Sequence, residues 1–354
     1  MKKIITIIGA RPQFIKASII SNIIKDIDNI EEIIVHTGQH FDKNMSKIFF
    51  DELQIPEATY NLNINKMSHS RMTSMMLEDL GDILEDENPN MVLLYGDTNS
   101  TLSGALAASK LNIPISHIEA GLRSYDKKMP EEINRIITDH ISSLLFCPTE
   151  QSIKNLLKEG FTSETGIRFV GDVMYDLFLK YKNVCKDRKI LKDIPKNYIL
   201  ITIHREDNTT KEKINKILSI MENTCKEYDI KVVFPVHPRT FKLIDFTKKY
   251  EGIYFINPVS YMDMLCLEMN SKLIVTDSGG VQKEACWCKI DCITLRDSSE
   301  WVETIQMGWN ELCNIDENEF FNYLNNIKIL RNRENPNYGN GKSGEKIIEE
   351  ILKY

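Results

Sequence analysis

The sequence has no long hydrophobic run. Its first apolar stretch, residues 4–8, is interrupted by Thr6 and followed by Arg11, unlike the continuous apolar core of a secretory signal. We predict that this stretch is a first β-strand. No later stretch approaches the roughly 20 apolar residues that a membrane-crossing helix requires. We therefore expect a cytoplasmic protein with no membrane partner.

Positive charge is not in excess. The 354 residues include 44 Lys and Arg against 51 Asp and Glu, which gives a net charge of −7. Proteins that bind nucleic acid over a broad surface concentrate Lys and Arg against the phosphate backbone. We therefore expect no nucleic-acid partner, although a small basic pocket is compatible with this composition.

Cysteine motifs for metal binding are also lacking. Of eight cysteines, only Cys286, Cys288 and Cys292 cluster, without the two-residue gap typical of zinc knuckles and with no histidine nearby. We predict buried free thiols and no metal site. The sequence contains neither a low-complexity tract nor a short-period repeat.

What is present indicates two α/β domains. A chain of 354 residues exceeds the usual size of a single core, so two domains of about 170 residues are expected. Apolar strands alternate with amphipathic helical stretches, which predicts doubly wound, Rossmann-like domains with parallel sheets. The predicted strands form two series, residues 4–8, 33–36, 91–95, 113–117 and 144–146, then 198–203, 231–236, 253–256, 273–276 and 292–295.

The segment between the two series is typical of a linker. Residues 176–196 are rich in lysine and end near Pro195. We predict an N-terminal domain of residues 1–175 and a C-terminal domain of residues 176–340. We expect residues 341–354 to form a helix that packs back on the N-terminal domain.

One strand-to-helix turn has the features of an anion site. The apolar residues 273–275 are followed by Asp277-Ser278-Gly279-Gly280. Glycines allow close approach of a ligand, and the free N–H groups of a first helical turn favour an anion such as a diphosphate. Glu284, one turn further, could accept hydrogen bonds from sugar hydroxyls. An ordinary glycine-containing turn is an equally good explanation of this stretch alone.

Polar residues follow the other predicted strands too. Ligands of open parallel sheets bind outside the carboxyl ends of the strands. Two such sheets facing each other would enclose a cleft lined by Arg11, Lys16, Asp97, Glu119, His204, Arg205 and Ser278.

Structural explanations exist for single members of this set. Asp97 and Asp277 are possible helix N-caps, and His117 is expected to be a core residue. Arg123 and Arg135 could pair with Glu131 or Glu132 as a surface cluster, where such pairs contribute little stability. The coincidence of three carboxylates and several cations at strand ends favours a site.

Residues 339–344 match the dinucleotide-binding pattern G-x-G-x-x-G. They do not follow a strand, and only ten residues remain after them, too few for a βαβ unit. We predict a turn into the last helix instead.

Seven motifs in register resemble the non-hydrolysing UDP-N-acetylglucosamine 2-epimerase family. They are GARPQFIK (9–16), GDTN (96–99), HIEAGLR (117–123), MPEEINR (129–135), VGD (170–172), TIHR (202–205) and TDSGG (276–280). The resemblance implies a two-domain, glycosyltransferase-B-like fold with the active site in the interdomain cleft. It also implies a homodimer that uses a UDP-sugar substrate and no cofactor.

The resemblance implies a reaction and residue roles as well. Members of the family invert C2 of a UDP-N-acetylhexosamine by anti elimination of UDP to a 2-acetamidoglucal, followed by re-addition of UDP. By motif position, the catalytic residues are Asp97, Glu119, Glu131 and His204. The implied substrate-binding residues are Arg11, Lys16, Arg123, Arg135, Arg205, Ser278, Gly279, Gly280, Glu284 and Trp301.

Two positions depart from the best-known pattern of the family. Trp301 stands where many members carry an arginine, and residues 301–303 are closer to the subgroup that epimerises UDP-2,3-diacetamido-2,3-dideoxyglucuronic acid. Residues 39–44 keep only part of a glutamine pair found in members activated by UDP-N-acetylglucosamine. The first candidate is interconversion of UDP-N-acetylglucosamine and UDP-N-acetylmannosamine, and the diacetamido-uronate is the alternative. A glycosyltransferase of the same fold is the alternative of another class.

Overall fold

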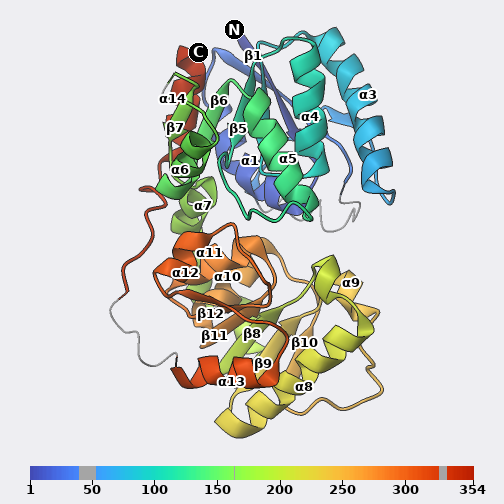
Figure 1. Cartoon of the computed structure of the whole chain (residues 1–354), viewed down its shortest axis with the longest axis vertical. Helices are drawn as coiled ribbons and strands as arrows, with labels where there is room; N and C mark the ends of the chain where they lie inside the picture. Colours follow the sequence, from blue (N-terminus) through green and yellow to red (C-terminus); the bar gives the residue numbers. More distant parts are fainter. Residues whose placement is uncertain (40–52, 163, 327–332) are drawn as a thin grey trace. The chain divides into compact units, whose positions relative to one another are not determined.

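The computed structural model describes residues 1–39, 53–162, 164–326 and 333–354. It divides the chain into two compact units (Figure 1). The N-terminal unit consists of Met1–Leu177 together with Asn337–Tyr354, and the C-terminal unit consists of Phe178–Pro336. None of the described helices is long and apolar enough to cross a membrane.

Within the described residues, the N-terminal unit contains one parallel sheet with the strand order β3-β2-β1-β4-β5-β6-β7. The order reverses between β1 and β4, which is the switch point where doubly wound sheets bind ligands. The strands are β1 (Lys2–Ile8), β2 (Ile30–His36), β3 (Tyr60–Asn61), β4 (Met91–Tyr95), β5 (Ile115–Ile118), β6 (Leu144–Cys147) and β7 (Ile167–Phe169). Its described helices are α1 (Arg11–Ile24), α3 (His69–Glu87), α4 (Asn99–Lys110), α5 (Pro130–Ile141), α6 (Glu150–Lys158) and α14 (Ser343–Lys353). Helix α7 (Val173–Tyr181) begins in this unit and crosses its boundary after Leu177.

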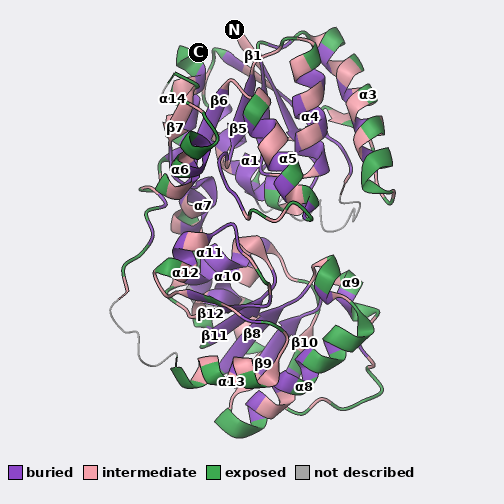
Figure 2. Ribbon diagram, viewed as in Figure 1, coloured by how far each residue is buried: buried purple, intermediate pink, exposed green. Residues whose placement is uncertain are grey.

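The central strands of this sheet are apolar and buried, as expected of a sheet covered on both faces (Figure 2). Helix α4 packs closely against them because it carries small residues. A Cβ atom on Gly104 would lie 2.8 Å from Ile7 Cδ1 and 2.9 Å from Leu94 Cδ2. The close packing fixes the start of α4 relative to the ends of β1 and β4.

The C-terminal unit repeats this plan. Its described sheet is parallel with the order β10-β9-β8-β11-β12-β13, and the switch point lies between β8 and β11. The strands are β8 (Tyr198–Thr202), β9 (Lys231–Pro235), β10 (Ile253–Ile256), β11 (Leu273–Thr276), β12 (Cys292–Thr294) and β13 (Asn310–Leu312). The helices are η1 (Val184–Asp187), η2 (Lys189–Lys192), η3 (Glu206–Asn208), α8 (Lys211–Tyr228), α9 (Pro238–Phe241), α10 (Tyr261–Asn270), α11 (Gly279–Cys288), α12 (Val302–Gln306) and α13 (Glu317–Asn326).

The prediction of two doubly wound parallel sheets is confirmed. All ten predicted strands are present, with ends displaced by no more than about three residues, the usual uncertainty of such boundaries. The strands β3, β7 and β13 were not predicted. They have two or three residues each, too few to show a hydrophobic period.

The segment that follows the C-terminal unit returns to the N-terminal unit. Residues 339–344 lead into α14, as predicted, and α14 packs against α1. Ser343 Oγ and the Gly344 N–H donate to the Asp176 carboxylate on α7, at 3.0 and 2.9 Å. Burial raises the pKa of Asp176 to about 6. Asp176 therefore binds the start of α14 with a carboxylate that is costly to ionise.

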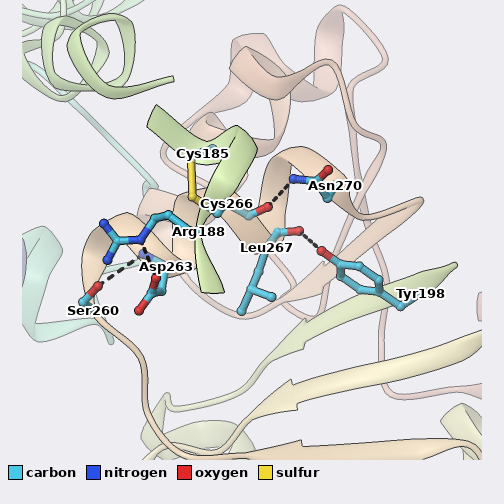
Figure 3. The surroundings of a disulfide bond; sticks show 8 residues. All are labelled: Cys185, Arg188, Tyr198, Ser260, Asp263, Cys266, Leu267 and Asn270. Carbon is cyan, nitrogen blue, oxygen red and sulfur yellow. Dashed lines mark hydrogen bonds and ion pairs between the residues drawn. A yellow bond between two sulfur atoms is a disulfide. The ribbon is translucent and has the colours of Figure 1, made fainter. Parts of the chain in front are cut away.

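The expectation of free thiols is wrong for one pair of cysteines. Cys185 in η1 and Cys266 in α10 form a disulfide (Figure 3). The adjacent Arg188 and Asp263 form an ion pair at 2.6 Å that joins the same two elements. The pairing could not be expected because 81 residues separate the two cysteines. The other described cysteines are free, and of the predicted cluster Cys286 and Cys292 are buried while Cys288 is partly exposed.

Candidate functional site

The ends of β1 and β4 are joined by the side chain of Gln13. Its Oε1 accepts hydrogen bonds from the N–H groups of Gly9 and Ala10, at 2.8 and 3.0 Å. Its Nε2 donates to the Tyr95 carbonyl at 2.9 Å and to Thr101 Oγ1 at 3.0 Å. The first turn of α1 is therefore fixed to the turn between β4 and α4. Sequence reasoning placed Gln13 in a motif but gave it no role.

Lys16 and Glu119 form a buried ion pair at this end of the sheet. Glu119 directly follows β5 and has a φ of +74°, a strained value for a residue with a side chain. A Cβ atom on Gly96 would lie 3.2 Å from Glu119 Oε2 and 3.3 Å from Lys16 Nζ. Glycine at position 96, with a φ of +63°, therefore leaves room for the ion pair.

Asp97 pairs with the buried guanidinium of Arg135 on α5. Arg135 also donates to Glu132 at 3.0 Å, and Glu132 accepts from the N–H groups of Ser124 and Tyr125 at 2.9 and 2.8 Å. The Asp97 side chain is 27% exposed, so a ligand can reach it. Thr98 caps α4, which removes the N-cap explanation for Asp97.

Glu131 lies in the first turn of α5, where it is half-exposed. It precedes Arg135 by four residues, so the two side chains share a helix face. Because Arg135 contacts Asp97, Asp97 lies next to the face of α5 that carries Glu131. Glu119 follows the adjacent strand, so the three predicted carboxylates lie on neighbouring connections at one edge of the sheet.

A buried charge network supports these connections. His117 Nδ1 lies 2.7 Å from Asp139 Oδ1, and His117 Nε2 lies 2.7 Å from the Gly96 carbonyl. Both partners are acceptors, so both ring nitrogens of His117 are held by buried polar groups. Asp139 also accepts from the Gly121 N–H at 3.1 Å and from Arg123 at 2.7 Å.

Arg123 is fully enclosed by this network and also pairs with Glu159 at 2.6 Å. Burial raises the pKa of Asp139, but His117 and Arg123 lower it further, and the net pKa lies below the ordinary value. The expectation that His117 is a core residue is confirmed. The surface explanation for Arg123 is wrong because its side chain is buried. Its partners are Asp139 on α5 and Glu159 at the end of α6.

In the C-terminal unit, Asp277 joins the turns that follow β8 and β11. Its carboxylate accepts from the N–H groups of His204 and Arg205, at 3.1 and 3.0 Å. Burial raises the pKa of Asp277, but His204 and these N–H groups lower it more strongly, so its pKa lies below the ordinary value. Ser278, not Asp277, is the N-cap of α11. The bridging role of Asp277 was missed because its partners are about 70 residues away in the sequence.

His204 presents one ring edge to solvent. Its Nδ1 lies 3.1 Å from Asp277 Oδ1, while the side chain is 41% exposed. Asp277 therefore orients the ring through Nδ1, and Nε2 lies on the other edge of the ring. The His237 ring lies 5.8 Å away, centroid to centroid.

The start of α11 (residues 278–280, the α11 loop) packs against residues 295–301, the β12 loop. A Cβ atom on Gly279 would overlap with Glu300 Oε1, so a larger residue there would require the Glu300 carboxylate or the helix start to move. Glu284 is buried further along α11, next to the hydroxyl of Tyr261 on α10. Burial and then the charge of Glu284 raise the pKa of Tyr261 well above its ordinary value.

The predicted site residues divide between the two units. The N-terminal unit contains Arg11, Lys16, Asp97, Glu119, Arg123, Glu131 and Arg135. The C-terminal unit contains His204, Arg205, Ser278, Gly279, Gly280, Glu284 and Trp301. Gln39 accepts from Ser100 Oγ at 2.8 Å, whereas residues 40–44 of the motif associated with activation lie outside the described residues. No group of His, Cys, Asp or Glu among the described residues is arranged to hold a metal ion.

Comparison with known proteins identifies the family of this chain. Residues 22–352 match the family model for UDP-N-acetylglucosamine 2-epimerase. The chain belongs to this epimerase family. The expected resemblance is therefore confirmed over nearly the whole sequence.

Members of the epimerase family similar to this chain carry two substrate names. A UDP-N-acetylglucosamine 2-epimerase homolog of Methanococcus maripaludis is 50% identical, covering 98% of each chain. The UDP-2,3-diacetamido-2,3-dideoxy-D-glucuronate 2-epimerase of Pseudomonas aeruginosa is 46% identical, covering 99% of each. The crystal structure of Methanocaldococcus jannaschii UDP-GlcNAc 2-epimerase in complex with UDP-GlcNAc and UDP matches with a TM-score of 0.93 and 43% identity over both whole chains. The expected glycosyltransferase-B-like architecture is confirmed by this match.

Proposed function

We propose that this epimerase-family chain is a non-hydrolysing UDP-N-acetylglucosamine 2-epimerase. It interconverts UDP-N-acetylglucosamine and UDP-N-acetylmannosamine by anti elimination of UDP and re-addition to a 2-acetamidoglucal. The observation that carries this proposal is the group of Asp97, Glu119 and Glu131 on neighbouring connections of one sheet, two of them paired with cations. The relative bound to UDP-GlcNAc and UDP supports it.

The carboxylates carry the proton chemistry of this proposal. Inversion at C2 removes a proton from one face of the sugar and returns one to the other face, which needs at least two acid/base groups. Asp97 is ligand-accessible, and Glu119 is held in a strained conformation beside Lys16. Arg123 is enclosed by its partners, so we assign it a positioning role behind these groups.

The C-terminal unit receives the leaving group. Breaking the anomeric C–O bond places negative charge on the diphosphate of UDP. The first turn of α11 offers N–H groups and the positive end of a helix dipole to that charge. His204, oriented by its contact with Asp277, acts at the departing phosphate, and Glu284 accepts from the ribose. By motif position, Arg11, Lys16 and Arg205 contact the nucleotide.

The same residues are compatible with a second substrate. Trp301 provides a planar ring where an arginine would provide charge, and the Pseudomonas aeruginosa relative carries the diacetamido-uronate name. UDP-2,3-diacetamido-2,3-dideoxyglucuronic acid is therefore the second candidate. In neither case does elimination and re-addition transfer electrons to an external acceptor, so no redox cofactor takes part.

Incubation with each UDP-sugar in D₂O, followed by ¹H NMR, tests the proposal. The true substrate gains deuterium at C2 and equilibrates with its C2 epimer without net hydrolysis. Release of free sugar would indicate a hydrolysing enzyme, and transfer to an added acceptor would indicate a glycosyltransferase. We also propose a cytoplasmic homodimer, by analogy with the family, and light scattering of the purified protein tests the dimer.

A further inference from the structure

Lys283 is a buried lysine on α11, one turn beyond the α11 loop. It is 1% exposed, and lysine is rarely buried to this degree without a partner for its ammonium group. Its Nζ lies 3.8 Å from the ring centroid of Trp301 and 5.5 Å from that of Trp287. Indole attracts cations more strongly than other aromatic side chains, and loss of water strengthens the attraction. The Lys283 ammonium group and the Trp301 ring therefore form a cation–π interaction.

The backbone of Trp301 is tied to the α11 loop by a second route. Its N–H donates to Ser299 Oγ at 3.0 Å, and Ser299 Oγ donates to Gln282 Oε1 at 2.6 Å. Gln282 Nε2 in turn donates to the Ser278 carbonyl at 3.1 Å. Gln282 thus fixes the backbone of the β12 loop, and the next residue, Lys283, contacts the ring at its end.

The side chains of the β12 loop lie directly against Gly279. Glu300 Oε1 occupies the space where a Cβ atom would project, and Trp301 Nε1 lies 3.8 Å from that position. Glu300 is paired with Arg296 at 2.8 Å, and both side chains are buried. A neutralised carboxylate and an indole edge therefore form the wall beside the first turn of α11.

We propose that Lys283 is a positioning residue that holds Trp301, and with it the β12 loop, against the α11 loop so that both form one wall of the UDP site. The inference rests on the proposed function, in which the α11 loop binds the diphosphate. Trp301 is 3% exposed, so the indole acts by filling and fixing this wall. In this proposal Lys283 acts on the UDP site through Trp301 and does not itself touch the reacting atoms.

Binding of UDP by calorimetry and epimerisation kinetics test this role. K283M keeps the side-chain length but removes the charge, and we expect it to weaken UDP binding by about tenfold. We expect KM to rise by a similar factor and kcat to stay within about threefold, because ground state and transition state lose the same contact. K283R should restore UDP binding to within about threefold, since a guanidinium also stacks on indole. K216M, an exposed lysine on α8, is the matched control and should bind UDP as the wild type does.

A double-mutant cycle separates the proposed contact from general destabilisation. W301L removes the aromatic face, and in that background K283M should change the UDP Kd by less than about twofold. W301F keeps an aromatic face and leaves Lys283 unchanged. It therefore tests the same contact if K283M does not fold. We expect W301F to bind UDP more tightly than W301L.

Three outcomes would overturn the inference: unchanged UDP binding in K283M, an equal loss in the W301L background, or equal binding by W301F and W301L. Each requires that the wild type binds UDP. A wild type that binds no UDP would instead refute the proposed function.

Discussion

The two units use one scaffold to present opposite chemistry at the carboxyl ends of their strands. At the N-terminal sheet the functional groups are carboxylates held by cations, with Lys16 on Glu119 and Arg135 on Asp97. At the C-terminal sheet a carboxylate is also present, but Asp277 is turned inward and holds the backbone of His204 and Arg205. What remains toward a ligand there is an imidazole and a glycine-rich helix start. The difference fits our proposal, in which the first unit transfers protons and the second binds the leaving anion.

The largest effect is expected from neutralising Asp97 or Glu119, the carboxylates that follow β4 and β5 of the N-terminal unit. D97N or E119Q should lower kcat by about 10²- to 10⁴-fold, because each removes an acid/base group of the C2 proton transfer. UDP affinity should stay within a few fold, since neither carboxylate binds the diphosphate in our proposal. Epimerisation followed by NMR and UDP binding by calorimetry measure the two effects. E78Q, an exposed residue of α3, is the control, and a D97N enzyme with normal turnover would remove Asp97 from the mechanism.

The second largest effect is expected from a substitution at the start of α11 in the C-terminal unit, which should weaken UDP binding. G279A places a methyl group onto Glu300 Oε1, so either the Glu300 carboxylate or the α11 loop must move, and we expect UDP binding to weaken by about tenfold. G81A is a matched control because a Cβ atom there meets nothing within 4 Å. In the interior of α3 that change should stabilise the protein by about 0.5–1 kcal/mol. Equal UDP affinity of G279A and wild type would contradict the placement of the diphosphate.

Asp176, a carboxylate away from the carboxyl ends of both sheets, extends the comparison to the pH dependence of stability. Asp176 is held by the neutral donors Ser343 and Gly344, and burial raises its pKa to about 6 from the ordinary 3.8. A raised pKa means that the folded protein binds the proton more tightly than the unfolded chain does. The stabilisation is therefore complete below pH 3.8 and is lost as the pH rises through 6.

D176N does not titrate and serves as the reference for this effect. Between pH 4.5 and 7.5 we expect the wild type to lose about 1–2 kcal/mol of unfolding free energy relative to D176N, after allowance for solvent access. Denaturant unfolding at both pH values measures the difference. The lost hydrogen bond of D176N is the same at each pH and cancels. A constant difference between the two proteins would show that Asp176 does not titrate in this range.

The smallest expected effect concerns recognition of the ribose. The Tyr261 hydroxyl lies beside Glu284, the residue to which we assign the ribose hydroxyls. Y261F should reduce the preference for UDP over 2′-deoxy-UDP or 3′-deoxy-UDP by about threefold to tenfold, because a hydrogen bond to a charged group contributes about 1.5–3 kcal/mol at most. E284Q should reduce it further. Unchanged preference in both variants would place the ribose elsewhere.

The sequence predicts most of the strands and the edges at which polar residues gather, because buried parallel strands are continuous apolar runs and turns carry glycine and charge. It does not predict the contacts that hold those edges. Gln13 reaches Tyr95, and Asp277 reaches His204, across 82 and 73 residues of chain. The disulfide between Cys185 and Cys266 was missed for the same reason. Such pairs become neighbours only through the strand order, which local patterns do not specify.

The return of α14 to the N-terminal unit also bears on how the chain folds during synthesis. A Cβ atom on Gly344 would lie 2.6 Å from Ile19 and 2.7 Å from Ile23 on α1, so α14 covers an apolar face of a helix near the start of the chain. Domains generally fold as they leave the ribosome, yet this face stays uncovered until residues 343–353 have been made. All residues of the C-terminal unit are therefore synthesised before the last helix of the N-terminal unit. The N-terminal unit can bury this face of α1 only after that helix has been made.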